Sequence, residues 1–218
     1  VPVDKSIPFE IAALLGCAVT TGVGAVLNRA KVQNGETVVV IGAGGVGLSV
    51  VMAAKLKGAS QVICIDQNIS ARNLAIELGA TDFLVSKQNE DISKKLMELT
   101  GVGADHVFEA VGKRELQSDA IDYCCAGGTV TFVGLDSEDA TINLKTTAIT
   151  RAEKTISGSI YGSACTHRDF ALYGEKFLEG KLPIDLMVNR RYQLGEINIA
   201  LSDMLAGKPG RGVIVFDH

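Results

Sequence analysis

A glycine-rich segment directly after a run of β-branched residues most constrains what this 218-residue chain can fold into. Thr37–Ile41 predicts a strand that is buried on both faces. Residues 42–47 follow it with the pattern Gly-x-Gly-x-x-Gly, and residues 45–57 predict a helix. Gly42 allows a tight turn, Gly44 lets the backbone approach a pyrophosphate, and Gly47 lets the helix pack closely on the strand. The free N–H groups at the start of this helix offer a place for an anion.

An acidic residue lies at the spacing expected of a dinucleotide-binding loop. Asp66 ends the next predicted strand, 19 residues after Gly47. A carboxylate there accepts hydrogen bonds from the adenosine ribose and repels a 2′-phosphate, so the pattern predicts a site that prefers NAD to NADP. The alternative is a glycine turn followed by a solvated aspartate. Arg72 has two interpretations as well, since it either weakens the exclusion of NADP or lies on a solvated helix face.

Strand and helix signals alternate along most of the chain. Such alternation predicts right-handed parallel βαβ units, and hence an α/β fold with a doubly wound, six-stranded parallel sheet. The predicted strands are residues 37–41, 61–66, 82–85, 105–110, 128–133 and 155–160. The predicted helices are residues 8–15, 20–30 (capped by Thr20 or Thr21), 45–57, 70–78, 91–100 and 116–124. A tail with helices 168–178 and 197–205 and a last strand 212–216 is expected to pack on a neighbouring element.

Charge and cysteine content narrow the classes of function. The formal net charge of −4 argues against a protein that binds nucleic acid. The five cysteines are odd in number and contain no C-x-x-C, which favours a reducing, cytoplasmic setting. Residues 11–28 and 37–54 are uncharged, but Gly and Thr interrupt them, so we expect buried core rather than membrane spans. No secretory signal is visible, and a first residue other than Met suggests that the chain starts inside a longer protein.

The cysteines themselves carry little information when taken alone. Cys17 lies in an apolar segment, where a cysteine is usually a small core residue. Zinc requires three or four ligands, and no Cys/His cluster with zinc-ligand spacing stands in the sequence. Cys124 and Cys125 fall at the end of a predicted helix, and we interpret the pair as helix packing.

Several segments in order resemble the zinc-containing medium-chain alcohol dehydrogenases. They are residues 15–22 (Leu-Gly-Cys-Ala-Val-Thr-Thr-Gly), the glycine loop with Asp66, residues 77–81 (Glu-Leu-Gly-Ala-Thr), and residues 207–212 (Gly-Lys-Pro-Gly-Arg-Gly). Most of that family's N-terminal GroES-like catalytic domain has no counterpart here. The resemblance implies that residues 1–20 end the GroES-like domain, 21–160 form a Rossmann NAD-binding domain, and 161–218 return to the catalytic domain.

The resemblance also implies a role for individual residues. Cys17 would be a ligand of a catalytic zinc whose other protein ligands, a cysteine and a histidine, precede Val1. Thr21 would lie against the nicotinamide ring, with Val46 behind it. Ala71 stands where many relatives carry a basic residue, and Arg72 is its candidate substitute. Arg211 would pair with the pyrophosphate, Val111 would flank the adenine, and backbone groups of Val133, Ser159 and Tyr161 would hold the carboxamide. The implied cofactor-binding residues are Gly42, Gly44, Gly45, Val46, Gly47, Asp66, Arg72, Val111, Val133, Ser159, Tyr161 and Arg211.

The function implied by this resemblance is NAD-dependent oxidation of an alcohol to an aldehyde or ketone, or the reverse, by zinc-assisted hydride transfer. Three alternatives stay open: a polyol, amino-alcohol or glutathione-adduct dehydrogenase, a zinc-free reductase, and an NAD-binding module without catalysis. We expect a small-molecule alcohol or aldehyde as partner, with no nucleic acid and no membrane, and we expect this chain alone to be inactive. The uncharged edge strand 155–160 predicts a homodimer or homotetramer, unless the C-terminal tail covers that edge.

Overall fold

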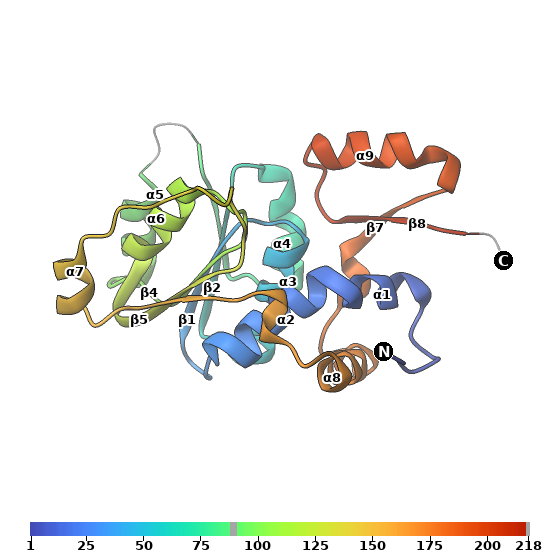
Figure 1. Cartoon of the computed structure of the whole chain (residues 1–218), viewed down its shortest axis with the longest axis horizontal. Coiled ribbons are helices and arrows are strands. Elements are labelled where there is room, and N and C mark those ends of the chain that lie inside the picture. The colour runs from blue at the N-terminus through green and yellow to red at the C-terminus, as the bar shows by residue number, and fades with distance from the viewer. Residues whose placement is uncertain (88–90, 217–218) are drawn as a thin grey trace.

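The computed structural model describes residues 1–87 and 91–216 and contains a six-stranded parallel sheet (Figure 1). The strand order is β3-β2-β1-β4-β5-β6, which is the doubly wound arrangement of dinucleotide-binding domains. The predicted fold class is therefore confirmed. The strands are β1 (Thr37–Ile41), β2 (Gln61–Asp66), β3 (Asp82–Val85), β4 (Ala104–Glu109), β5 (Cys124–Phe132) and β6 (Thr155–Gly158).

The sheet is covered on both faces, as the continuous apolar run in β1 predicts. Val38 and Val40 join the larger hydrophobic cluster, to which α3 (Gly45–Leu56) and α4 (Arg72–Leu78) contribute. Val39 and Ile41 point the other way and join a second cluster with α5 (Ile92–Thr100) and α6 (Arg114–Tyr123). Successive strand side chains alternate between faces, so one short strand serves two cores.

The first helical region differs from the prediction. Residues Phe9–Ala30 form one continuous helix, in which α1 (Phe9–Leu14) and α2 (Thr20–Gly24) are joined by a wider π-helical stretch, Leu15–Val19. The predicted break with a threonine cap is wrong, because Thr20 lies in mid-helix, fully buried. Its hydroxyl donates to the Leu15 carbonyl oxygen at 2.6 Å instead of capping a helix start.

This helix is long and apolar enough to cross a bilayer by length and composition. However, 61% of its most apolar window is buried inside the structure, as expected for a core helix. Two glycines allow that burial. A Cβ on Gly22 would collide with the Val46 carbonyl oxygen of α3, and a Cβ on Gly24 would collide with the Gly162 carbonyl oxygen. The helix can therefore lie directly against the start of α3.

The turn from α6 into β5 also corrects the prediction. α6 ends at Tyr123, so Cys124 and Cys125 begin the strand rather than pack at a helix end. The sequence predicts this strand at residues 128–133, whereas β5 begins four residues earlier, at Cys124. The pairing of β4 with β5 shifts register between Ala104 and His106, and this irregularity accommodates Gly127 and Gly128 inside the strand.

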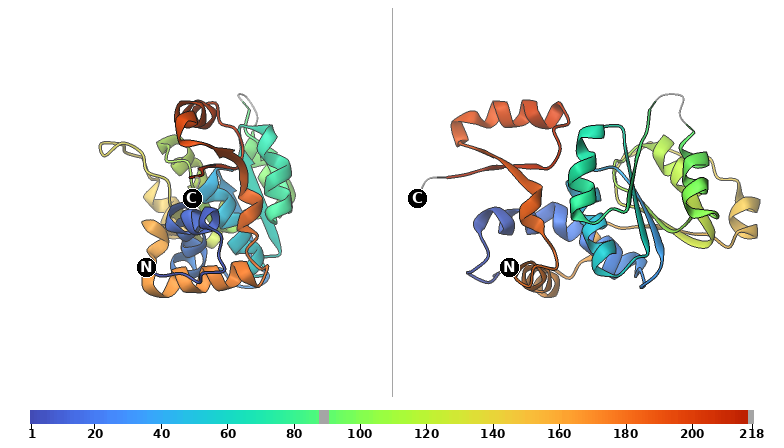
Figure 2. Two further views of the ribbon diagram at one scale, coloured as in Figure 1. Left: turned by 90° about the vertical axis from the view of Figure 1, so that its right-hand side faces the viewer. Right: turned by 180° about the vertical axis from the view of Figure 1, so that it is seen from behind.

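The C-terminal part forms a second, smaller unit beside the sheet (Figure 2). α8 (Thr166–Leu178) packs on the long helix, where the Asn28 amide donates to the Asp169 carboxylate at 3.1 Å. Further along, β7 (Val188–Tyr192) and β8 (Arg211–Ile214) pair in parallel as a separate two-stranded sheet, with α9 (Ile197–Leu205) between them in sequence. Neither β7 nor α7 (Thr146–Arg151) was predicted. The last strand begins and ends slightly earlier than expected.

Candidate dinucleotide site

The glycine loop makes the tight connection between β1 and α3. Gly42 has a φ of 105°, a conformation that suits glycine, and its N–H donates to the Ile65 carbonyl oxygen at 2.8 Å. A Cβ on Gly47 would collide with the Gly42 carbonyl oxygen, so only glycine allows the helix to start this close to the strand. A Cβ on Gly44 would meet no atom within 4 Å. The loop backbone is therefore open to an incoming ligand at Gly44.

Asp66 lies against this loop from the neighbouring strand. One carboxylate oxygen accepts a hydrogen bond from the Ala43 N–H at 2.6 Å, and the other accepts one from the Asn68 N–H at 2.8 Å. Because parallel β1 and β2 end at the same edge, their register places the acid next to the loop. The carboxylate is fixed in place and keeps free lone pairs for further donors.

A cleft of about 860 Å³ opens between the loop and the C-terminal unit, and we call it the loop cleft. One wall contains Gly44, Gly45 and Asp66, and the other contains α9 and the segment from Lys208 to Gly212. The Asn68 side-chain amide bridges the two walls by donating to the Gly207 carbonyl oxygen at 2.7 Å. Asn68 had no distinguishing signal in the sequence, since its partner lies at the far end of the chain.

Arg211 lies where the loop cleft meets the start of α3. A Cβ on Gly45 would collide with the Nε and Cζ atoms of Arg211, so the guanidinium lies against that glycine. A helix N-terminus carries a partial positive charge and unpaired N–H groups. The combination of this helix end and a planar, permanently charged guanidinium concentrates positive charge at one end of the loop cleft, which is chemically suited to an anion.

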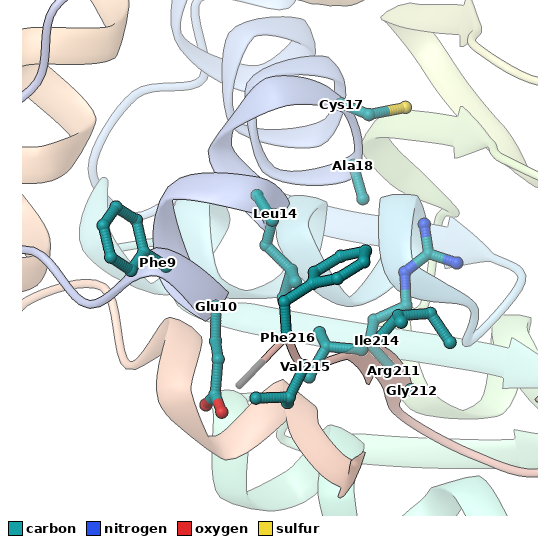
Figure 3. Close-up of a pocket in the computed structure, with 12 residues that line it drawn as sticks. Phe9, Glu10, Leu14, Cys17, Ala18, Arg211, Gly212, Ile214, Val215 and Phe216 are labelled. Atoms are coloured by element: carbon teal, nitrogen blue, oxygen red, sulfur yellow. The ribbon is translucent and has the colours of Figure 1, made fainter. Parts of the chain in front are cut away.

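A second hollow of about 610 Å³ begins on the other side of Arg211 (Figure 3). Its lining is mostly apolar and includes Phe9, Leu14 and Phe216, while Cys17 and Ala18 contribute from the long helix. Figure 3 shows the Arg211 guanidinium directed toward the helix turn that carries Ala18 and Cys17. The thiol of Cys17 is exposed, so Cys17 is not the core residue that its apolar context suggested.

A strained turn after β6 contains Tyr161, one of the expected site residues. Tyr161 and Ser163 both have positive φ values, 51° and 48°, on either side of Gly162. Two hydrogen bonds hold this turn to the long helix: the Tyr161 hydroxyl donates to the Gly16 carbonyl oxygen, and the Asn28 amide donates to the Gly162 carbonyl oxygen.

The other predicted site residues do not all lie in one place. Thr21 and Val46 lie where the long helix meets α3, and both are half-buried. Val133 and Ser159 line a separate hollow beyond β5. Arg72 is exposed at the start of α4 and does not line the loop cleft, whereas Ala71 does. In the described residues, no group of three or more His, Cys, Asp or Glu side chains could hold a metal ion.

Glu109 is a buried residue that no pattern in the sequence singles out. It ends β4 with 0% of its surface exposed, and its Oε1 atom accepts hydrogen bonds from the N–H groups of Val111 and Gly112, both at 2.8 Å. Burial raises the pKa of Glu109, while the donated hydrogen bonds oppose that rise. The carboxylate shapes the turn that carries Val111, which packs against Gly42. The same strand also contains Asp105 and His106, so an acid at its end was not a distinguishing signal in the sequence.

The fold defines the class: an α/β dinucleotide-binding domain with a glycine loop at the start of its first crossover helix. The family model described as zinc-binding dehydrogenase matches residues 45–178. The chain therefore belongs to the zinc-binding dehydrogenase family.

Known relatives agree with this assignment. The chain is 34% identical to S-(hydroxymethyl)glutathione dehydrogenase from Saccharomyces cerevisiae, over 100% of this chain and 58% of that protein. It is 36% identical to the NDMA-dependent alcohol dehydrogenase of Amycolatopsis methanolica, over 99% of this chain and 58% of that protein. The crystal structure of benzyl alcohol dehydrogenase from Acinetobacter calcoaceticus matches with a TM-score of 0.95 at 33% identity, over 100% of this chain and 59% of that one. The chain thus spans a little under three fifths of these relatives.

The burial of Glu109 leads to a prediction about stability and pH. Because the folded-state pKa is raised, the folded chain holds this proton to a higher pH than the unfolded chain does. The stabilisation that the folded chain gains by holding the Glu109 proton is fully present below the ordinary glutamate pKa. It is lost as pH rises through the raised pKa of the folded chain. Glu109→Gln, which keeps an acceptor and cannot ionise, should therefore gain stability relative to the parent chain as pH rises above the ordinary glutamate pKa.

Urea unfolding of both chains at several pH values measures this difference. The control, Glu109→Leu, leaves two N–H groups without an acceptor and should lose about 1–3 kcal/mol throughout. A difference between the glutamine variant and the parent that does not change with pH would show that Glu109 does not titrate in this way.

Proposed function

We propose that this chain is the coenzyme-binding part of an NAD-dependent, zinc-assisted alcohol dehydrogenase, which interconverts an alcohol and an aldehyde or ketone. The observation that carries the proposal is the position of Arg211 against Gly45, at the start of α3 and in the same cleft as Asp66. This arrangement offers positive charge to a pyrophosphate and a carboxylate to a neighbouring ribose.

The coenzyme would lie along the carboxyl edge of the sheet. The N–H groups at Gly44 and Gly45, together with Arg211, would hold the pyrophosphate, and Asp66 would accept hydrogen bonds from the adenosine ribose. Val111, held by Glu109, would flank the adenine. At the nicotinamide end we assign Thr21 and Val46 to the ring, and the backbone at Val133, Ser159 and Tyr161 to the carboxamide. The exposed position of Arg72 gives it at most a long-range electrostatic role.

The division into parts is also a proposal. Residues 1–20 and 161–218 would belong to a catalytic domain, and residues 21–160 would form the NAD-binding domain. The separate β7–β8 sheet supports this division, as does the paired hydrogen bonding of Arg191 with Glu10, at 2.7 Å, which joins β7 to α1. The boundary at residue 20 falls inside one continuous helix, so a rigid element would connect the two parts.

Zinc would polarise the oxygen of the alcohol when bound, as a Lewis acid does. The exposed thiol of Cys17, facing the hollow beside Arg211, fits the role of one ligand. The described residues offer no complete set, so the other ligands would come from outside this chain. Because the relatives carry names with different alcohol substrates, we keep the substrate at the level of a small alcohol or aldehyde. A polyol, an amino-alcohol or a glutathione adduct is included.

The proposal predicts the choice of coenzyme. Calorimetric titration of this chain should show tighter binding of NADH than of NADPH. Asp66→Ala should narrow that gap by roughly 1–3 kcal/mol, because it removes ribose hydrogen bonds and the repulsion of a 2′-phosphate. Asp82→Ala is the matched control, since Asp82 starts β3 at the opposite edge of the sheet and lies outside the loop cleft. Equal or tighter binding of NADPH by the unaltered chain contradicts the proposal.

The zinc assignment predicts metal content as well as activity. Elemental analysis should find no stoichiometric zinc in this chain, and zinc in the whole protein. In the whole protein, Cys17→Ala should remove that zinc and the dehydrogenase activity together. Cys165→Ala, which alters another exposed thiol, serves as the control and should leave both unchanged. If the Cys17 variant keeps its zinc, Cys17 is not a ligand.

We propose that two copies associate through the β6 edge, as a homodimer or within a homotetramer. β6 pairs only with β5, and the tail forms its own sheet, so among the described residues no strand covers the outer edge. Ile160, 73% exposed, lies just beyond the strand. Ile160→Lys should shift the chain from dimer to monomer in sedimentation velocity. If the unaltered chain is already monomeric at micromolar concentration, this interface does not form.

A cytoplasmic location completes the proposal. The five cysteines are all free, as expected in a reducing compartment. Fractionation of cells that make the whole protein tests it, since recovery in a membrane or secreted fraction would contradict it.

A further inference from the structure

Arg190 has no role in the function proposed above, yet it lines the loop cleft from β7. Its guanidinium donates to the Pro209 carbonyl oxygen at 2.8 Å and to the Lys208 carbonyl oxygen at 3.3 Å. One planar group thus holds two successive carbonyls of the turn that precedes β8. A guanidinium suits this task because its N–H groups are fixed in a fork.

The turn that Arg190 holds leads directly into Arg211. Gly210 has a φ of 78°, so the chain reverses in a left-handed conformation just before β8 begins. The register of the small sheet pairs Arg190 with Gly212 and Val188 with Arg211. The direction in which Arg211 leaves this turn therefore depends on how the turn is attached to β7.

A second side chain from β7 supports the same attachment. The Asn189 amide donates to the Pro209 carbonyl oxygen at 2.7 Å. Asn189 also packs so closely on Gly210 that a Cβ there would collide with it. The loop cleft thus has an arginine, Arg211, at the start of α3, and a second arginine, Arg190, that grips the backbone just before it.

We propose that Arg190 is a positioning residue for the anion site: it fixes the 208–210 turn so that Arg211 stays over the start of α3. This inference rests on the proposed function, in which Arg211 pairs with the coenzyme pyrophosphate. Arg190 does not touch the pyrophosphate. Its effect on binding passes entirely through Arg211.

The test compares ligands with and without a pyrophosphate. In calorimetric titrations, Arg190→Ala should weaken the binding of ADP-ribose by about tenfold, on the scale of one charged hydrogen bond. It should leave the binding of adenosine unchanged, because adenosine has no phosphate. Arg190→Lys should not restore affinity, since an ammonium group lacks the planar fork that spans two carbonyls. Loss of adenosine binding, or full rescue by lysine, would overturn the proposal.

A double-mutant cycle separates positioning from direct contact. If Arg190 acts through Arg211, then Arg190→Ala should cause no further loss in a chain that already carries Arg211→Ala. Additive losses would mean that Arg190 contacts the ligand itself, and the positioning role would be wrong.

The neighbouring arginine of the same strand provides a matched control. Arg191 pairs with Glu10 on the other side of β7, so Arg191→Ala removes the same charge without touching the turn. It should leave the ADP-ribose dissociation constant within about twofold. Weakening equal to that of Arg190→Ala would point to net charge and overturn the proposal.

If the unaltered chain bound neither NADH nor ADP-ribose, the proposed function would fail first. Binding that depends on Arg211 and is indifferent to Arg190 would overturn this inference alone.

Discussion

The close approach of several backbone segments around the start of α3 is the constraint on which the rest of the structure depends. Gly47 lets the helix meet the end of β1, Gly22 lets the long helix cross α3, and Gly45 leaves room for the Arg211 guanidinium. A methyl group at any of these positions would collide with an atom of the opposing segment. Three glycines therefore bring one helix end into contact with a strand, a long helix and the C-terminal unit.

The close approach of these segments to the start of α3 forms the loop cleft and brings its charged groups together. The first strand and its neighbour bring the glycine backbone and Asp66 to one edge, because parallel strands end together. The C-terminal unit then adds Arg211 from across the cleft, and Asn68 joins the two walls by its bond to Gly207. A negative group and a positive group face the same cleft from opposite walls, and such a pair suits a ligand with hydroxyl groups at one end and phosphates beside them.

Buried and half-buried polar contacts hold the turns that follow β4 and β6. Glu109 fixes the turn at Val111 by two hydrogen bonds, while Asn28 holds the turn at Gly162 and also donates to the buried carboxylate of Asp169. Buried polar groups are stable only when they find partners, so each of them requires one arrangement of its loop. The strained turn at Tyr161 persists because the long helix holds it from the other side. Order in the irregular segments thus comes from a few side chains in the core.

The sequence by itself determined the alternating α/β order, the six strands, the glycine loop and its acid, because periodicity and turn chemistry act between residues close in the chain. It misjudged the break before Thr20 and the start of β5, where buried contacts override local signals. No local pattern indicated β7, the hydrogen bonds from the Val111 turn to Glu109, or the hydrogen bonds that Arg190 donates to the turn before Arg211. β7 and Arg190 depend on partners distant in sequence, and only the tertiary structure decides which distant groups meet, because packing and satisfied hydrogen bonds act on the whole chain at once.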